Sequence, residues 1–271
     1  MFDEIRKIFV FITRDFRMLS TYKLAFFVSV INVIFNLFYM ILFGSMFGVT
    51  NLLPLAEYGG NYIAYILIGS IGWAFLWTIM ETTSASLSTE MMMGPLESVL
   101  LTKTRLSTMM ISYALFGAIF GIFSMVVFMI VGFVVYGLSL FANASIFTFI
   151  IFALSTAMMM GFGMIFGGLT LWLKNIGETV PLLKNIVMFF CGVYFPASVL
   201  PGVLPQVRYG IPFYYSIEGL RRSLIPSTPT SDLLFYVVML LIFTVVFILL
   251  GLYVLHRCMI KAKRDGSLAF Y

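Results

Sequence analysis

The chain of 271 residues is 62% hydrophobic and only 10% charged, which leaves too little polar surface for a soluble protein of this size. We therefore predict an all-α membrane protein in which one membrane domain occupies nearly the whole chain. The net charge of +5 is compatible with a nucleic-acid partner, but the basic residues stand at the edges of apolar runs instead of forming one patch. That pattern is typical of membrane topology, and we expect no nucleic-acid binding.

The first 22 residues predict an amphipathic helix. Apolar residues recur at intervals of three and four, which places them on one helical face, although Val10 and Phe11 interrupt the pattern. Basic residues occupy much of the remaining surface. We therefore expect residues 1–22 to form an interfacial helix beneath acidic lipid headgroups. The apolar residues are Phe2, Ile5, Ile8, Phe9, Ile12, Phe16 and Leu19, and the basic ones are Arg6, Lys7, Arg14 and Arg17.

Six apolar runs follow, and each is long enough to cross, or nearly cross, about 30 Å of hydrocarbon. Together they predict a membrane domain over residues 23–257, followed by a basic tail over residues 258–271. The fifth run is short because Pro196 ends it. The predicted spans are Leu24–Phe47, Tyr62–Glu81, Ser107–Tyr136, Ile146–Leu173, Val180–Phe195 and Leu233–Leu255.

The Lys and Arg residues predict the orientation of these spans. Thirteen of them fall on one side of the membrane and three on the other. Since basic residues concentrate in cytoplasmic loops, the side with thirteen is expected to be cytoplasmic. Both termini should therefore lie in the cytoplasm, with the protein in the cell membrane.

The chain is broken at Gly94-Pro95, between the second and third predicted spans. The residues that follow predict a short amphipathic helix with Glu97 in its first turn, where an acidic side chain suits the helix dipole. Leu96 and Leu100 are four residues apart and share one face of this helix.

Four prolines break the chain again before the last predicted span. Backbone near the outer leaflet cannot stay unpaired in lipid, so residues 196–226 should form short helices that are shielded by protein and dip back into the membrane. Glu218 lies three and four positions before Arg221 and Arg222, which predicts a local ion pair on one helical face. The prolines are Pro196, Pro201, Pro205 and Pro212.

The sequence lacks the residue patterns of an enzyme. It has no His, Cys or carboxylate cluster with metal-ligand spacing and no Gly-Lys dipeptide, so the phosphate-binding loop of ATPases is missing. We expect no catalytic residue, metal or cofactor on this chain. Polar groups within the spans are mostly neutral, and Asn32 and Asn36 serve either as interhelical glue or as substrate contacts. Candidate residues of a translocation path are Asn32, Asn36, Thr78 and Phe190.

Both broken segments carry a family resemblance. Residues 90–104 resemble the G-T-L-E-x-L-L-x-T-P stretch of the ABC-2 family of ABC exporter permeases, with Pro95 in place of threonine and Lys103 in place of proline. Residues 190–221 are similar to the family's F-x-S-G-x-F-F-P, L-P and N-P-L-T-Y-x-x-E-A-L-R sequence, with Ile211 in place of asparagine. The matched outer residues include Phe195, Pro196, Pro201, Pro212, Glu218 and Arg221.

The resemblance implies the membrane subunit of an ATP-driven exporter, with six transmembrane helices, an N-terminal interfacial helix and short re-entrant helices before the last span. It also implies a homodimer, or alternatively a heterodimer, on two ATPase subunits that bind ATP and Mg. The family's coupling helix would correspond to Gly94, Pro95, Leu96, Glu97 and Leu100. The implied activity is outward transport of a lipid, a hydrophobic drug or a glycoconjugate by alternating access.

Two other classes stay open as alternatives: a secondary transporter or channel, and a lipid-modifying membrane enzyme. Both would be expected to keep charged or catalytic side chains at mid-membrane depth, and the predicted spans hold almost none. The carrier alternative also lacks recognisable inverted halves.

Overall fold

The described part of the chain is entirely helical. The computed structural model describes residues 2–21, 28, 31, 34–35, 38–39, 42, 62–92, 98–99, 101–102, 104–138, 142–173, 179–225 and 228–264. Within these residues every regular element is a helix, eight of them α-helices. The all-α prediction is confirmed.

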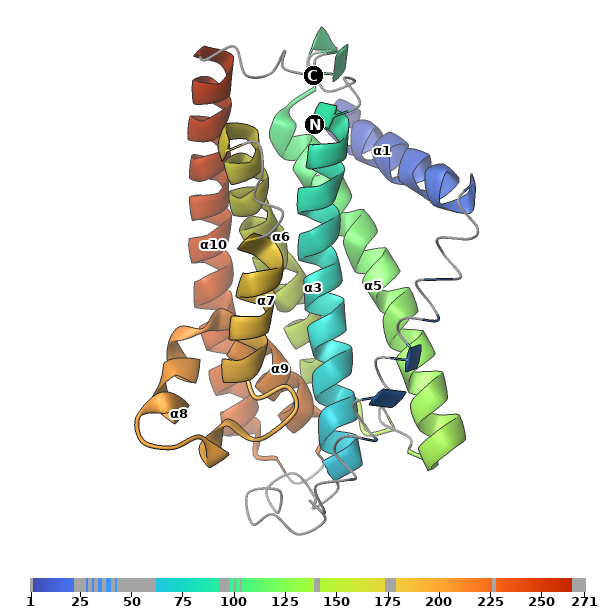
Figure 1. Ribbon diagram of the computed structural model, residues 1–271, viewed down its shortest axis with the longest axis vertical. Coiled ribbons are helices and arrows are strands. Elements are labelled where there is room, and N and C mark those ends of the chain that lie inside the picture. The colour runs from blue at the N-terminus through green and yellow to red at the C-terminus, as the bar shows by residue number, and fades with distance from the viewer. Residues whose placement is uncertain are drawn as a thin grey trace.

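Four long helices form the body of the molecule and run along its long axis (Figure 1). They are α3 (Tyr62–Met92), α5 (Leu106–Tyr136), α6 (Ile146–Leu173) and α10 (Thr230–Arg264), and all four are long and apolar enough to cross a membrane. At 1.5 Å per residue they measure roughly 40–50 Å, so they extend beyond about 30 Å of hydrocarbon. The chain is therefore a multi-pass membrane protein.

The structure supports four of the six predicted spans. The first, Leu24–Phe47, lies largely outside the described residues. The residues described within it are 28, 31, 34–35, 38–39 and 42, and all of them are helical. The fifth corresponds to α7 (Thr179–Phe190), which ends five residues before the predicted boundary at Phe195. Its 12 residues cover about 18 Å, too short for a span by themselves. Six spans remain a prediction.

Past the expected end of the second span at Glu81, α3 continues as a helix to Met92. The added turns are rich in Ser and Thr, which read as a polar boundary in sequence. In the structure, Thr82 donates to the carbonyl of Thr78 at 2.7 Å, and Thr83 donates to the carbonyl of Ile79 at 2.6 Å. Each hydroxyl is satisfied by its own helix, so these polar residues do not end it. The last helix likewise continues to Arg264, past the predicted end at Leu255.

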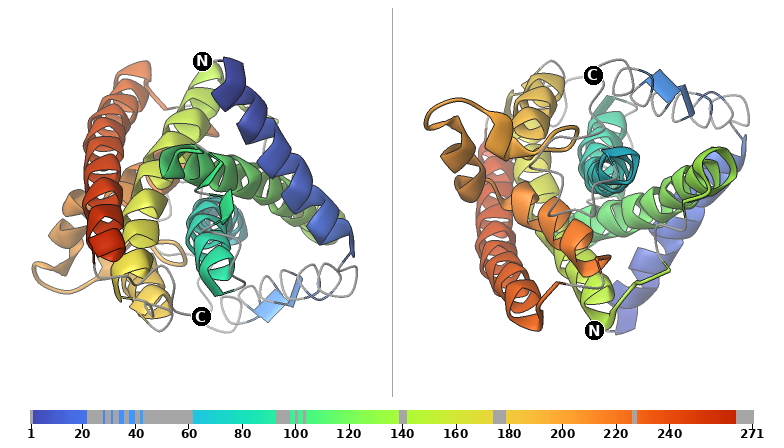
Figure 2. Two further views of the ribbon diagram at one scale, coloured as in Figure 1. Left: turned by 90° about the horizontal axis from the view of Figure 1, so that it is seen from above. Right: turned by 90° about the horizontal axis from the view of Figure 1, so that it is seen from below.

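The core surrounds α3, which packs against α5 and α6, while α10 lies along α6 (Figure 2). Small residues allow these helices to approach closely. A Cβ added to Gly117 of α5 would lie 3.0 Å from Ile79 Cα, and one added to Gly163 of α6 would lie 2.9 Å from Thr83 Cβ. These glycines therefore serve packing within one chain.

Two distinct ends complete the fold. At one end, α1 (Phe2–Thr21) crosses the bundle obliquely and packs on α5 (Figures 1 and 2). We call this the α1 end. At the opposite, α9 end, the chain forms the predicted series of short helices, and α9 packs against α3, α6 and α10. This series consists of η3 (Ala197–Val199), α8 (Leu204–Val207), η4 (Arg208–Gly210) and α9 (Pro212–Ser223).

Candidate functional site

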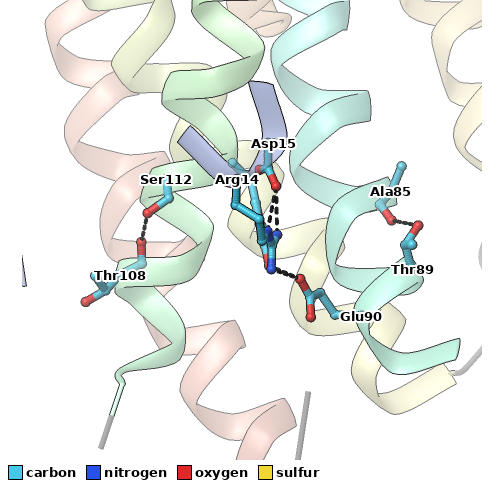
Figure 3. A network of polar contacts seen from close by, with 8 residues as sticks. Arg14, Asp15, Ala85, Thr89, Glu90, Thr108 and Ser112 are labelled. Atoms are coloured by element: carbon cyan, nitrogen blue, oxygen red, sulfur yellow. Dashed lines mark hydrogen bonds and ion pairs between the residues drawn. The ribbon is translucent and has the colours of Figure 1, made fainter. Parts of the chain in front are cut away.

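A polar cluster ties α1 to the ends of α3 and α5 (Figure 3). Arg14 of α1 donates from Nη1 to Oε1 of Glu90 on α3. The same carboxylate oxygen accepts a hydrogen bond from the Tyr113 hydroxyl of α5 at 3.1 Å. Arg14 also holds its neighbour Asp15 with Nε and Nη2 at 2.9 and 2.8 Å. One guanidinium therefore serves two carboxylates and joins three helices.

Both carboxylates depend on Arg14. Glu90 is buried, and burial raises the pKa of Asp15 above its usual range, although the hydrogen bonds from Arg14 act against this shift. The second oxygens, Asp15 Oδ2 and Glu90 Oε2, accept no hydrogen bond from any described residue. Loss of the guanidinium would leave the two carboxylates without this charged partner, at a cost that is reduced because the site is partly hydrated.

Contacts along α1 extend this anchor. The ring of Phe11 meets that of Tyr113 edge to face, with centroids 6.2 Å apart, and the ring of Phe16 meets that of Phe116 at 5.2 Å. Thr108 donates to Glu4 at 2.5 Å, which together with Lys7 lowers the pKa of that carboxyl group. The helix is thus fixed to α5 near its start, middle and end.

The predicted coupling residues Gly94, Pro95, Leu96, Glu97 and Leu100 all lie outside the described residues, so their role stays a prediction. Their described neighbours Ser98, Val99 and Leu101 are helical. Val99 packs against the apolar cluster that contains Phe11, whereas Leu101 is 84% exposed. The segment is therefore attached beside α1 while part of its surface is open.

A second polar cluster lies within the bundle, about 16 Å before the end of α3. The indole of Trp77 donates to Glu81 Oε1 at 2.6 Å, and Lys184 Nζ of α7 lies 3.5 Å from the same oxygen. The ammonium also lies 5.2 Å from the centre of the Trp77 ring. Both charged side chains are partly open, at 55% exposure for Glu81 and 35% for Lys184. Ionisable side chains on membrane helices are candidates for substrate contact.

The predicted path residues are only partly described. Asn32 and Asn36 lie outside the described residues. Thr78 of α3 is half-buried, and its hydroxyl donates to the carbonyl of Ala74 at 2.7 Å. Phe190 ends α7, where its ring meets that of Phe189 at 5.4 Å. Their part in a path stays a prediction.

The α9 end is built around Arg221, which is only 2% exposed. Its Nη1 donates to the Tyr65 hydroxyl of α3 at 2.9 Å, and its Nη2 donates to the carbonyl of Val193 at 2.7 Å. Glu218 lies 3.6 Å from Arg221 and accepts from Arg222 at 2.8 Å, so the predicted ion pair is confirmed. A Cβ at Gly69 would overlap both the guanidinium and the carbonyl of Val193, so a side chain there is excluded.

The other predicted outer residues surround this centre. Phe195 packs its ring on that of Phe189 at 5.3 Å. Pro196 precedes η3, and its carbonyl accepts from the Val199 amide at 3.0 Å. Pro201 follows η3, and Pro212 begins α9, where its fixed φ suits the first helical turn. The prolines thus separate the short helices.

Sequence reasoning missed Arg14, Glu90, Trp77, Lys184 and Tyr65 as members of joined clusters. The Trp77–Glu81 contact has a local signal, because residues four apart share a helix face. The other links join residues far apart in the chain. Among the described residues, no group of three or more His, Cys, Asp or Glu side chains could hold a metal ion. The three clusters hold helices together through charge pairs.

Comparison with known proteins gives one family. The model of the family described as ABC-2 type transporter matches residues 6–225, from the first turns of α1 to just past the last of the short helices at the α9 end. No curated protein matches the chain.

Proposed function

This chain belongs to the ABC-2 type transporter family, and from that premise we propose that it is the membrane subunit of an ATP-driven exporter. ABC-2 membrane domains act in transport, lack ATPase activity themselves and generally pair with an ABC ATPase. In this proposal the partner binds ATP and Mg, and the exported compound is a lipid, a hydrophobic drug or a glycoconjugate.

The observation that carries the mechanism is the junction of α1, α3 and α5. The predicted coupling helix at residues 90–104 overlaps the last residues of α3 and leads to the start of α5, and Arg14 joins α1 to both helices through Glu90 and Tyr113. A push on that segment by a closing ATPase would move the three helices together. Leu96 and Leu100 would supply the apolar contact face, Glu97 would meet a basic group, and Gly94-Pro95 would fix the turn.

Topology and assembly complete the proposal. The start of α1 and the end of α10 lie at the same end of the bundle (Figure 1), which supports the assignment of both termini to the cytoplasm. We infer a homodimer, with a heterodimer as the alternative, whose interface contains the path. Glu81 and Lys184 join Asn32, Asn36, Thr78 and Phe190 as candidate path residues.

For the test, the full chain is co-expressed with its ATPase subunit, and the purified complex is reconstituted into proteoliposomes. Replacing Leu96 and Leu100 together by Ser, or Glu97 by Arg, should reduce ATPase co-purification or uncouple hydrolysis from transport, with normal expression. The matched control is Val203→Ser, a change of a 72% exposed aliphatic residue at the α9 end, which should be silent. If binding, hydrolysis and transport all survive the coupling variants, the proposal is wrong.

The pair Glu81–Lys184 favours a secondary transporter as the second candidate function, because such transporters often place ion-coupling groups inside the membrane. ATP dependence separates the two functions. An exporter stops when the ATPase is inactivated and continues without an ion gradient, whereas a secondary transporter shows the opposite response.

A further inference from the structure

A cavity of about 420 Å³ lies at the α1 end, between the start of α5 and the last turns of α10. Three of its lining residues are basic, two carry hydroxyl groups and four are apolar. They are Arg105, His256 and Lys263, then Thr104 and Ser107, then Leu106, Leu252, Leu255 and Met259. We call this the α5–α10 cavity.

The basic side chains of the cavity are available to a ligand. The side chains of Arg105, His256 and Lys263 make no hydrogen bond or ion pair with any described residue, and Arg105 and Lys263 are exposed. Glu4 is close enough for Arg105 to contribute to its lowered pKa. However, the two oxygens of Glu4 already accept from Lys7 and Thr108. The cavity therefore has a surplus of positive charge that Glu4 offsets only in part.

The apolar lining favours a ligand that carries a hydrocarbon chain. Leu106 and Leu255 are buried at the back of the cavity, at 8% and 3% exposure, whereas Leu252 is 41% exposed along α10 toward the middle of the bundle. A free inorganic anion would use only the basic rim. An anion with an attached hydrocarbon chain would use both parts.

We propose that the α5–α10 cavity binds the phosphoryl headgroup of an anionic membrane lipid, with an acyl chain against Leu252. Basic pockets between helices at the cytoplasmic membrane surface bind such headgroups. Thr104 and Arg105 also connect the predicted coupling helix to α5, so a bound headgroup holds the end of the coupling helix in place. The site needs neither the ATPase nor the transported compound.

Binding is tested on the purified full chain in nanodiscs of phosphatidylcholine, with a labelled phosphatidylglycerol as the probe. The double variant R105Q/K263Q should weaken probe binding roughly thirtyfold, because each basic residue contributes about a factor of five to the attraction of an anionic lipid. The matched control is R257Q/K261Q on α10, the helix that also carries Lys263. Those two cations pack on Tyr253 and Trp172 instead of lining the cavity, and their loss should change binding less than threefold.

A second variant guards against a folding defect in the first. Ser107→Asp puts a carboxylate among the cations at the first turn of α5, a position that favours acidic residues, so the helix should stay intact while probe binding falls. Equal effects of the two double variants would reduce the finding to general surface charge and overturn the proposal. Displacement of the probe by millimolar inorganic phosphate would assign the site to a free anion, and undiminished binding by every variant would also exclude the lipid site.

Discussion

The two ends of the bundle are both held by an arginine, but in opposite surroundings. Arg221 at the α9 end is 2% exposed and lies against Tyr65, Val193 and a carboxylate three residues away. Arg14 at the α1 end is 41% exposed and joins Glu90, 76 positions further along the chain. A buried charge is expensive to release, whereas a partly hydrated one exchanges its partner for water at small cost. The difference indicates that the α9 end is fixed and that the joint of α1 with α3 at Arg14 and Glu90 can open.

The largest effect is expected from breaking the buried arginine. Arg221→Ala should destabilise the protein by about 3–5 kcal/mol, because Glu218 and the carbonyl of Val193 lose a partner inside the protein. Thermal unfolding in nanodiscs measures this loss.

Two glycine-to-alanine variants test the packing around the Arg221 side chain. Gly69→Ala should also destabilise, by about 1–3 kcal/mol, since its methyl group would overlap the guanidinium. Gly210→Ala is the control, because a Cβ there meets no atom within 4 Å. Equal melting temperatures of the two alanine variants would contradict a fixed α9 end.

A smaller effect is expected at the joint of α1 with α3. Arg14→Ala should cost only about 1 kcal/mol, because the side chain is partly hydrated, but it should free α1 from α3. Hydrogen exchange should then speed up in α1 and not in α9. The exposed Arg17→Ala on the same helix is the control. Slow exchange in α1 of the Arg14 variant would mean that its aromatic contacts alone hold the helix.

The middle cluster should matter for transport more than for stability. Glu81→Gln and Lys184→Met should leave melting nearly unchanged, since both side chains are partly exposed, and should lower transport at normal ATPase activity. The exchanged pair E81K/K184E keeps the attraction between the helices and reverses its direction. Full transport by both single variants would remove the cluster from the path.

The smallest effect concerns pH at the α1 end. The pKa of Glu4 is lowered by the hydrogen bond from Thr108 and by Lys7, so its contribution to docking is complete above the ordinary carboxyl pKa. This contribution is lost as pH falls through the lowered value. Burial raises the pKa of Asp15, so the contribution of Asp15 to stability changes with pH in the opposite direction. The difference in α1 exchange between wild type and Glu4→Gln isolates Glu4, and it should shrink on acidification.

What the sequence could predict is what short-range spacing determines. Residues three and four apart predicted α1 and the Glu218–Arg221 pair, and the prolines predicted the short outer helices. The continuation of α3 past Glu81 was not predicted, because a hydroxyl bonded to its own helix looks like a polar boundary in sequence.

Contacts between distant segments carry no such signal. Phe11 interrupts the apolar stripe of α1, yet it is the residue of that helix that is buried against Tyr113. The pairing of Arg14 with Glu90 likewise depends on the packing of three helices, so no local pattern could have shown it.

The length of α3 has a mechanical consequence. Tyr65 and Glu90 are separated by about seven turns and point in nearly the same direction around the helix axis. Each is bound to a different neighbour, Arg221 near one end and Arg14 near the other. Because both contacts lie on the same side of α3, the helix cannot rotate about its own axis without breaking one of them. The easiest motion of α3 is therefore a tilt about its buried contact with Arg221, which moves the opposite end of the helix, at Glu90, the furthest.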